Sequence, residues 1–562
     1  MAETLIGTLR EHPEVTFFLV LGIGYLIGKL KIGGFTLGAV TGTLLAGVAV
    51  GQLGLRVSGE VKQAFFVLFL FSIGFRTGPQ FFRGLRSGGV QQAALSVIIA
   101  TTGLIVAYVV SRLFGYDAGT AAGVIAGALT ESATIGTASD AITRLGLPEA
   151  DAAAMINRIP VSFAVTYLIG VVGAAWFLAQ LAPRLMGINL EEECRRYERE
   201  MLGQGPDTGA SKRLVDYRAY DLLPGSPLAG LRVRDLEQLA RDARLFVERI
   251  RRDDRVIDPA ATMILQPLDR IAVVGRRELL VSRMDEQKLG ILEVHDGELL
   301  DIPAEALDVV ITVADVDGRT LTDLAAEDFA RGVFVRRILR AGTPIPIFPA
   351  TELHRGDVVT LVGPSRMVAE ATARLGVPDR ATDATDMVLV AFGIVAGALI
   401  GLPALMLGRL EIGLSLSVGV LVGGLTCGWL RSMWPRFFGR IPAPTLWVFE
   451  SLGLAGFVAV VGLDAGPDFV TGLRTAGVSL VVAGLVTVLV PHAVGLAVGR
   501  WVFHMPPGVL LGVCAGAGTA TPALAAIQEA AKSSVPTLGY GVSYAVGNVL
   551  LALWGTVIVA LL

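Results

Sequence analysis

Two long apolar stretches, at about 15–183 and 386–562, constrain this chain more than any other feature. Each is many times longer than the roughly 20 apolar residues with which one helix crosses a bilayer, so each predicts several spans. The composition agrees, because 53% of the 562 residues are hydrophobic and only 17% are charged, whereas soluble domains carry roughly 25% charged residues. The mean hydropathy is +0.63. The sequence therefore predicts a polytopic α-helical membrane protein.

Charge and motif content exclude several other classes of protein. The formal net charge of −3 offers no basic field for nucleic acid. The three cysteines, Cys194, Cys427 and Cys514, are too far apart in sequence for a metal-binding or disulfide pattern. No Walker, GxSxG or HExxH motif occurs in its required context. We expect no enzyme activity, no cofactor, no metal and no nucleic-acid partner.

Each apolar stretch divides into five predicted spans and one polar or small-residue segment. The spans of the first stretch are 15–30, 36–54, 61–77, 90–114 and 160–183, and those of the second are 386–407, 412–430, 447–465, 475–503 and 537–561. The remaining segments are 118–146, which holds several hydroxyl and carboxyl side chains, and 508–531. Because lipid tolerates few unpaired polar groups, both segments are predicted to be broken or re-entrant hairpins.

The two stretches are internal repeats of one another. Gly74–Phe81 matches Gly462–Phe469 at a spacing of 388 residues, and Thr130 falls on Thr519 at 389. Five crossings and a re-entrant hairpin in each half give the second copy the inverted orientation, an arrangement known in transporters. The arginine and lysine count favours a cytoplasmic insert between the halves and both termini on the outer side of the membrane.

The charged insert, about 185–385, contains a repeat of its own. Phe246–Ile250 matches Phe334–Ile338 at a spacing of 88 residues, and apolar residues alternate in 270–275 and 357–363 as in short strands. The insert is therefore predicted to form two small α+β modules, without the glycine-rich fingerprint of a nucleotide-binding Rossmann unit. The predicted domains are 1–184, 185–294, 295–385 and 386–562.

Arg76 is the most informative charge within a predicted span. It follows the apolar run 64–75 and precedes Gly78 and Pro79, a pair expected to break the helix. Because the guanidinium fork donates two parallel hydrogen bonds to a carboxylate, Arg76 fits a carboxylate ligand. Two alternatives stay open: Arg76 pairs with an acid such as its repeat counterpart Asp464, or its side chain reaches an interface.

The two polar segments share small residues, hydroxyls and predicted half-helix starts. Free N–H groups at such starts attract anions, and two breaks can form one central site. Packing between helices explains the same composition, with hydroxyls bonded to preceding carbonyls. His492 and His504 are isolated and receive no role. The predicted substrate-binding residues are Arg76, Thr130, Glu131, Ser132, Thr134, Asp464, Thr519, Thr521 and Asn548, and the predicted helix breaks are Gly78, Pro79, Gly466, Pro467 and Pro522.

The paired Gly74–Phe81 and Gly462–Phe469 elements, the threonine-rich segments and the insert modules, which resemble TrkA-C domains, carry a family resemblance. Over nearly the whole chain, the sequence resembles the aspartate:alanine exchanger family of bacterial secondary transporters. The resemblance implies antiport of small carboxylates, aspartate against alanine, with a cytoplasmic insert. We further expect a homodimer and a small-molecule regulator at the modules.

Two other functions stay open. Relatives in the same family include proposed dicarboxylate exporters, so export of a succinate-like substrate is the first alternative. The second is an ion channel gated by the TrkA-C-like modules. The lack of a TVGYG-like filter in the sequence and the two inverted halves argue against a channel.

Overall fold

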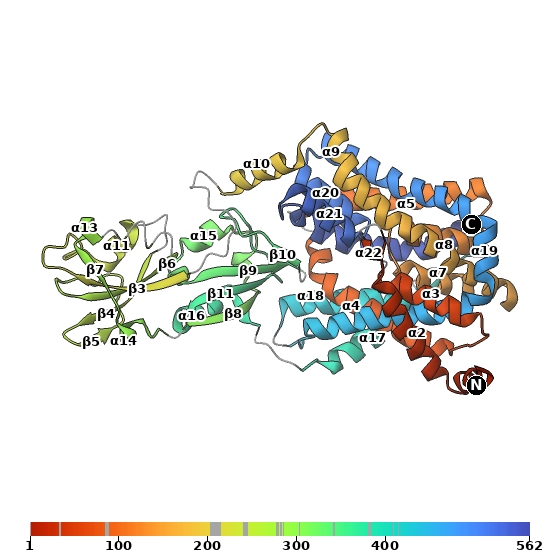
Figure 1. The fold of residues 1–562 in the computed structure, drawn as a ribbon, viewed down its shortest axis with the longest axis horizontal. Helices are drawn as coiled ribbons and strands as arrows, with labels where there is room; N and C mark the ends of the chain where they lie inside the picture. The colour runs from red at the N-terminus through yellow and green to blue at the C-terminus, as the bar shows by residue number, and fades with distance from the viewer. Residues whose placement is uncertain are drawn as a thin grey trace. The chain divides into compact units, whose positions relative to one another are not determined.

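The computed structural model describes residues 2–32, 35–36, 38–84, 89–202, 215–239, 245–276, 280, 284, 286–302, 304–340, 343–379, 384–407, 410–413, 415–435 and 437–562 (Figure 1). The chain forms two compact units. The first, here called the membrane unit, comprises 1–197, 339–345 and 381–562, and the second, the insert unit, comprises 198–338 and 346–380.

Helices account for most of the membrane unit, and every predicted span contains a helix. Those of the first half are α1 (Ala2–Glu11), α2 (Pro13–Gly28), α3 (Ala39–Gly51), α4 (Gly59–Gly84), α5 (Val90–Phe114), α6 (Ala118–Ala128), α7 (Ala133–Thr143), α8 (Glu149–Trp176), the π-helix η1 (Phe177–Leu181), α9 (Ala182–Leu185) and α10 (Leu190–Leu202). Those of the second half are α17 (Met387–Gly401), α18 (Leu416–Met433), α19 (Ala443–Trp501), α20 (Pro507–Ala517), α21 (Thr521–Ala531) and α22 (Thr537–Leu561). The facing ends of the spans 386–407 and 412–430 instead form the antiparallel strands β13 (Ala404–Leu407) and β14 (Leu410–Gly413). Among the described residues, seven helical segments are long and apolar enough to cross a membrane.

The predicted hairpins are broken helices. In the first half α6 and α7 are separated by 129–132, and in the second half α20 and α21 are separated by 518–520. Each of the four helices has 11 residues and is therefore about 16 Å long, half the thickness of the apolar layer of a bilayer. The prediction of a broken helix pair in each repeat is confirmed.

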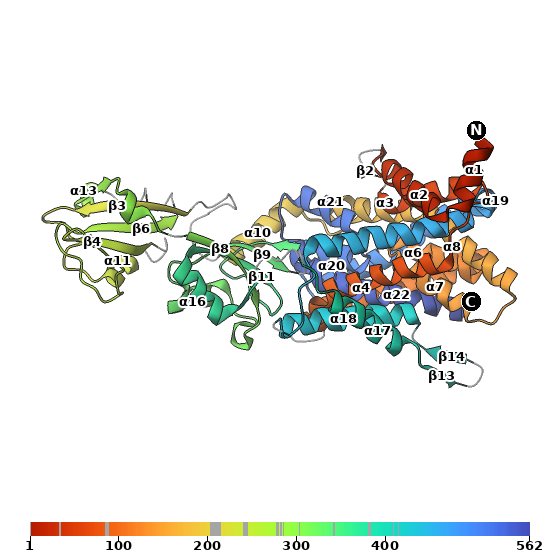
Figure 2. The ribbon, with the colours of Figure 1, turned by 90° about the horizontal axis from the view of Figure 1, so that it is seen from below.

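Two predicted breaks are wrong. Helical hydrogen bonding continues through Gly466 and Pro467, so α19 is one helical stretch of 59 residues (Figure 2). Its two apolar parts, Ala443–Pro467 and Gly477–Trp501, are nevertheless two separate candidate membrane spans, as predicted. Likewise α4 continues through Gly78 and Pro79 to Gly84. A proline removes one backbone hydrogen bond, but a break would leave several groups unpaired in lipid, where each costs several kcal/mol.

The repeats pack on one another reciprocally. Helix α4 of the first half contacts α18 of the second, and α19 of the second half contacts α3 of the first. At these crossings a Cβ on Gly74 would collide with the Leu421 carbonyl, and one on Gly462 would lie 2.7 Å from the Leu44 carbonyl oxygen. The shared glycine of the repeated motif therefore permits the same close helix approach in both halves.

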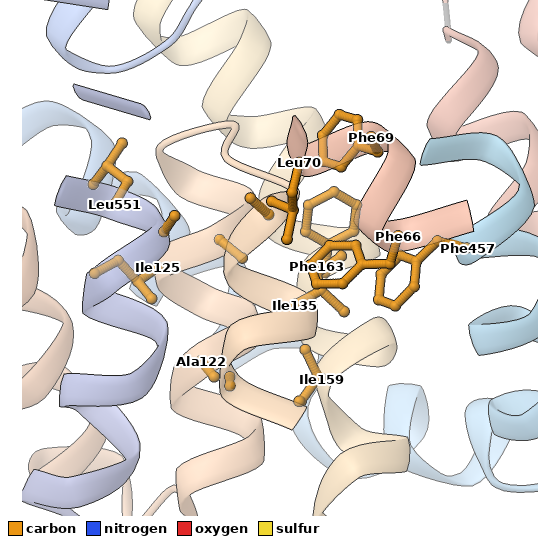
Figure 3. Packing of buried hydrophobic residues seen from close by; sticks show 14 of the residues in the cluster. Phe66, Phe69, Leu70, Ala122, Ile125, Ile135, Ile159, Phe163, Phe457 and Leu551 are labelled. Carbon is orange, nitrogen blue, oxygen red and sulfur yellow. The ribbon is translucent and has the colours of Figure 1, made fainter. Parts of the chain in front are cut away.

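Aromatic packing fills the centre of the membrane unit. Phe66 of α4 stacks on Phe457 of α19 with ring centroids 4.3 Å apart, and Ile135 of α7 and Phe163 of α8 belong to the same buried cluster (Figure 3). This cluster holds the first broken helix against α4, α8 and α19. The position of the break is therefore fixed by the core.

The insert unit contains two β-sheets, which confirms the predicted α+β modules. The strands of the first sheet, in spatial order, are β5 (Arg255–Ile257), β4 (Phe246–Arg252), β6 (Arg270–Arg276), β3 (Val215–Leu222) and β7 (Ile291–Val294). The second sheet places β9 (Phe334–Arg340), β11 (Val358–Pro364), β8 (Ala304–Ile311) and β12 (Gly376–Pro378) side by side, and α16 (Ser365–Leu375) packs on three of them. The smaller elements of the insert unit are α11 (Val233–Leu239), α13 (Glu286–Leu289), α14 (Gly297–Leu300), η3 (Ala314–Val316), α15 (Leu321–Ala325) and η4 (Asp328–Ala330), whereas β10 (Thr343–Ile345) belongs to the membrane unit.

Candidate transport site

The two helix breaks meet each other at Thr130 and Thr519. Both threonines adopt left-handed backbone conformations, with φ of 53° and 51°, which β-branched residues rarely adopt. The Thr130 hydroxyl donates to the Gly518 carbonyl at 3.1 Å, and the Thr519 hydroxyl donates to the Leu129 carbonyl at 2.9 Å. The two hydroxyl oxygens are 3.3 Å apart. Because equivalent residues exchange equivalent hydrogen bonds, the crossing lies at a local two-fold axis between the repeats.

The two breaks differ in charge. Glu131 follows Thr130, is only 3% exposed, and accepts a hydrogen bond from the Ala133 N–H at 3.1 Å. Its carboxyl group therefore sits at the positive N-terminal end of α7. The equivalent residue of the second break is Ala520, which has no polar side chain. The start of α21 consequently lacks the carboxyl group that α7 has.

Arg76 pairs with Glu450 and not with Asp464, which corrects the partner suggested by the sequence. Its Nη1 atom is 2.9 Å from Glu450 Oε2 on α19, and 38% of the Arg76 side chain is exposed. The other carboxyl oxygen, Glu450 Oε1, is buried and has no hydrogen-bond partner among the described residues. Asp464 instead lies 3.9 Å from the Lys62 ammonium.

These two ion pairs occupy equivalent positions with opposite charges. Arg76 corresponds to Asp464, and Lys62 corresponds to Glu450, both at the repeat spacing of 388 residues. Within each pair, α4 supplies the cation and α19 the anion. Lys62 and Arg76 are 14 residues apart on one helix, which corresponds to about 21 Å. The pairs therefore bracket the crossing of α4 and α19 from its two ends.

Two tyrosines of α22 complete the site. The Tyr540 and Tyr544 rings are stacked with centroids 5.1 Å apart, and the Tyr540 hydroxyl is 2.9 Å from the Thr521 hydroxyl at the start of α21. Tyr544 lies near Arg76, Glu131 and Glu450. The structure thus brings the predicted residues Arg76, Glu131 and Thr521 around one aromatic pair.

Other predicted residues serve helix packing. The Thr134 hydroxyl donates to the Leu551 carbonyl of α22 at 2.8 Å, and the Asn548 amide donates to the Tyr544 carbonyl at 2.7 Å. Ser132 is a buried residue directly before α7. Pro522 is the second residue of α21, where a proline costs no helical hydrogen bond.

Sequence reasoning did not select Tyr540, Tyr544, His492 or Glu450 for this site, although the repeat contained a signal for the two tyrosines. Val542–Tyr544 mirrors Val165–Tyr167, and the rings of Phe163 and Tyr167 in the first half are also 5.1 Å apart. His492 of α19 gave no such signal. It is 1% exposed, and its ring abuts Gly518 of the second break.

Comparison with known proteins agrees with this architecture. The family model described as a predicted permease membrane region, Asp-Al_Ex, matches residues 16–183 and 389–560. The chain belongs to this permease family. TrkA-C domain models match 217–281 and 308–376 within the insert. The family resemblance of the motifs is thereby confirmed.

Relatives of the family are similar over their full length. An uncharacterized transporter of Shewanella oneidensis is 40% identical over 99% of both chains. One of Bradyrhizobium diazoefficiens is 39% identical over 91% of this chain and 98% of its own. One of Bordetella parapertussis is 37% identical over 99% of this chain and 98% of its own. The chain is therefore a multi-pass membrane protein of a transporter family.

Proposed function

We propose that this protein is a secondary transporter that exchanges small carboxylates across the bacterial inner membrane, with aspartate and alanine as the substrate pair. The observation that carries the proposal is the crossing of two broken helices at Thr130 and Thr519, next to Arg76. Discontinuous helices that meet between repeats form the substrate sites of many secondary transporters. Because the first break carries the carboxyl group of Glu131 and the second carries Ala520, the two sides of such a site differ chemically.

A substrate carboxylate would bind between Arg76 and the start of α21. The Arg76 guanidinium has five N–H donors, and its Nη1 atom contacts Glu450 in the structure. At α7 the carboxyl group of Glu131 already occupies the helix start, whereas Ala520 leaves the start of α21 to a ligand. Tyr544 and Tyr540 would line the space between these two groups.

The two ion pairs supply a mechanism for alternating access. Equivalent pairs at opposite ends of the α4–α19 crossing would close the site alternately, because exchange of the two repeat conformations exchanges their environments. The N–O distance is 2.9 Å in the Arg76–Glu450 pair and 3.9 Å in the Lys62–Asp464 pair, so the first ion pair would close its end of the site more firmly than the second. A substrate carboxylate would replace Glu450 at Arg76 and thereby open the end of the site that this ion pair closes.

We further place the insert in the cytoplasm and both termini outside, and we propose that the protein acts as a homodimer with a small regulator bound to the insert. The arginine and lysine distribution supports this orientation.

Counterflow in proteoliposomes tests the proposed exchange. Labelled aspartate should enter faster when the vesicles contain unlabelled aspartate or alanine than when they are empty. Equal uptake in both cases would contradict exchange and favour a channel. Acceleration by internal succinate, without acceleration by alanine, would assign the dicarboxylate alternative.

A further inference from the structure

The two modules of the insert unit contact each other through a polar and aromatic interface. Arg331 of the second module donates to Glu237 of the first at 2.6 and 3.1 Å and to the Val247 carbonyl at 3.1 Å. Phe246 and Phe334, which are equivalent residues of the two modules, pack edge to face with centroids 6.2 Å apart. The interface thus joins equivalent strands of the internal repeat.

Glu248 is buried in this interface without a partner for one of its oxygens. It is 7% exposed, and its Oε1 atom has no hydrogen-bond partner among the described residues. Gly332 of the second module covers it, because a Cβ on Gly332 would lie 2.6 Å from that oxygen. The charged groups around the carboxyl are Arg331 and Arg366 of the second module and Glu237 and Asp258 of the first, and the phenol of Tyr217 on β3 also lies near it.

A β-bulge occurs at Glu248. In β4, Val247 pairs with Val273 and Arg249 pairs with Ala272, so Glu248 is the extra residue between them. Val247 is buried in the hydrophobic core of the first module, and Glu248 is buried against Gly332 of the second. Bulges commonly redirect a side chain at functional positions.

The module fold does not require a carboxyl group at this position. The equivalent residue of the second module is Arg336 on β9, and it is exposed. A buried carboxylate with one oxygen that lacks a hydrogen-bond partner is unfavourable, and taking up a proton removes most of that penalty. The position is therefore suited to a group that binds and releases a proton.

We propose that Glu248 is a proton-binding site that holds the two modules together in its protonated form and loosens their interface when it ionises. Burial raises the pKa of Glu248 to about 7, Arg331 and Arg366 oppose the rise, and Glu237 and Asp258 add to it. The native interface therefore binds more protons than the separated modules between about pH 4.5 and pH 7. Its stability is greatest at acidic pH and falls as the pH rises through that window.

Hydrogen exchange of the full-length protein in nanodiscs tests the proposal. After correction for intrinsic rates, amides of 245–252 and 331–338 should lose at least tenfold in protection between pH 5.5 and pH 8. Glu248→Gln, which mimics the protonated form, should keep the same protection at both values. Arg336→Gln, at the equivalent exposed position, is the matched control and should retain the wild-type pH dependence.

Two results would overturn the assignment. One is an unchanged pH dependence in Glu248→Gln, which would assign the effect to another group. The other is equal protection of the wild-type interface at both pH values, which decides the matter even if the variant does not fold. Neither measurement depends on the substrate or on the transport mechanism.

Discussion

The pair Arg76–Glu450 and the pair Lys62–Asp464 stand at equivalent positions of the two repeats, but their charges are exchanged. The first is a short contact next to Tyr544 and the helix breaks, and the second is a longer one at the other end of the crossing. The two repeats thus share the arrangement of their helices, but they carry different charged side chains at equivalent positions. We propose that the symmetry permits two related conformations and that the charge difference confines carboxylate recognition to one end of the site.

The same contrast occurs elsewhere in the chain. Glu131 in the first break corresponds to Ala520 in the second, and Glu248 in the first insert module corresponds to Arg336 in the second. By contrast, Thr130 and Thr519 are identical and make identical hydrogen bonds. Shared residues therefore build the scaffold of the repeats, and differing residues carry the functions that we propose.

Arg76→Lys should have the largest effect on the difference between the two ion pairs. An ammonium cannot reproduce the bidentate fork, so the change should cost about 1.5 to 3 kcal/mol, or roughly ten- to a hundred-fold in the Kd for a carboxylate. Binding of labelled aspartate to purified protein measures the loss. Asp464→Asn is the matched control, since this residue pairs with Lys62, and it should keep its affinity while exchange slows.

Equal losses of affinity in these two variants would show that the ends of the crossing are not chemically distinct. Normal exchange by a correctly inserted Arg76→Gln protein would remove Arg76 from the site altogether.

Glu450→Gln sharpens the comparison by removing the competitor for Arg76. If a substrate carboxylate must displace Glu450, the variant should bind aspartate up to about tenfold more tightly, because one charge-assisted contact no longer has to be broken. Titration calorimetry in detergent measures this change.

The alternative is a purely structural ion pair. In that case Glu450→Gln should lower the unfolding temperature and leave the affinity unchanged, and the double variant with Arg76→Gln should recover much of the lost stability. A tighter Kd with an unchanged unfolding temperature would favour competition with the substrate.

Hydropathy and repeat spacing predicted the helices, the broken pairs and the two modules, because these are local or periodic properties of a sequence. They did not predict the continuity of α19 through Pro467, since neighbouring helices decide whether a proline ends a helix. The partner of Arg76 was also out of reach. Glu450 could be assigned to it only once the two-fold relation between α4 and α19 was known in space.

The direction of individual side chains was the other property that the sequence did not predict. Alternation along β4 predicts the face of each residue, but the bulge at Glu248 shifts the register of the strand, and no residue of the strand signals that bulge. Tyr544 was within reach because it belongs to a repeated tripeptide, whereas the buried His492 has no equivalent histidine in the first half. Three-dimensional packing, and not composition, determines these positions.

Thr130→Ala and Thr519→Ala provide the smallest effect and the strictest test of the symmetry. Each change removes one hydrogen bond from a hydroxyl to the opposite break, so each should lower the stability of the membrane unit by about 0.5 to 1.5 kcal/mol. Thermal unfolding in nanodiscs should give the same shift for both variants. In the double variant the losses should not add, because the two hydroxyls are 3.3 Å apart and share one network. Additive losses of unequal size would mean that the two breaks are held independently and that the crossing is not a symmetric unit.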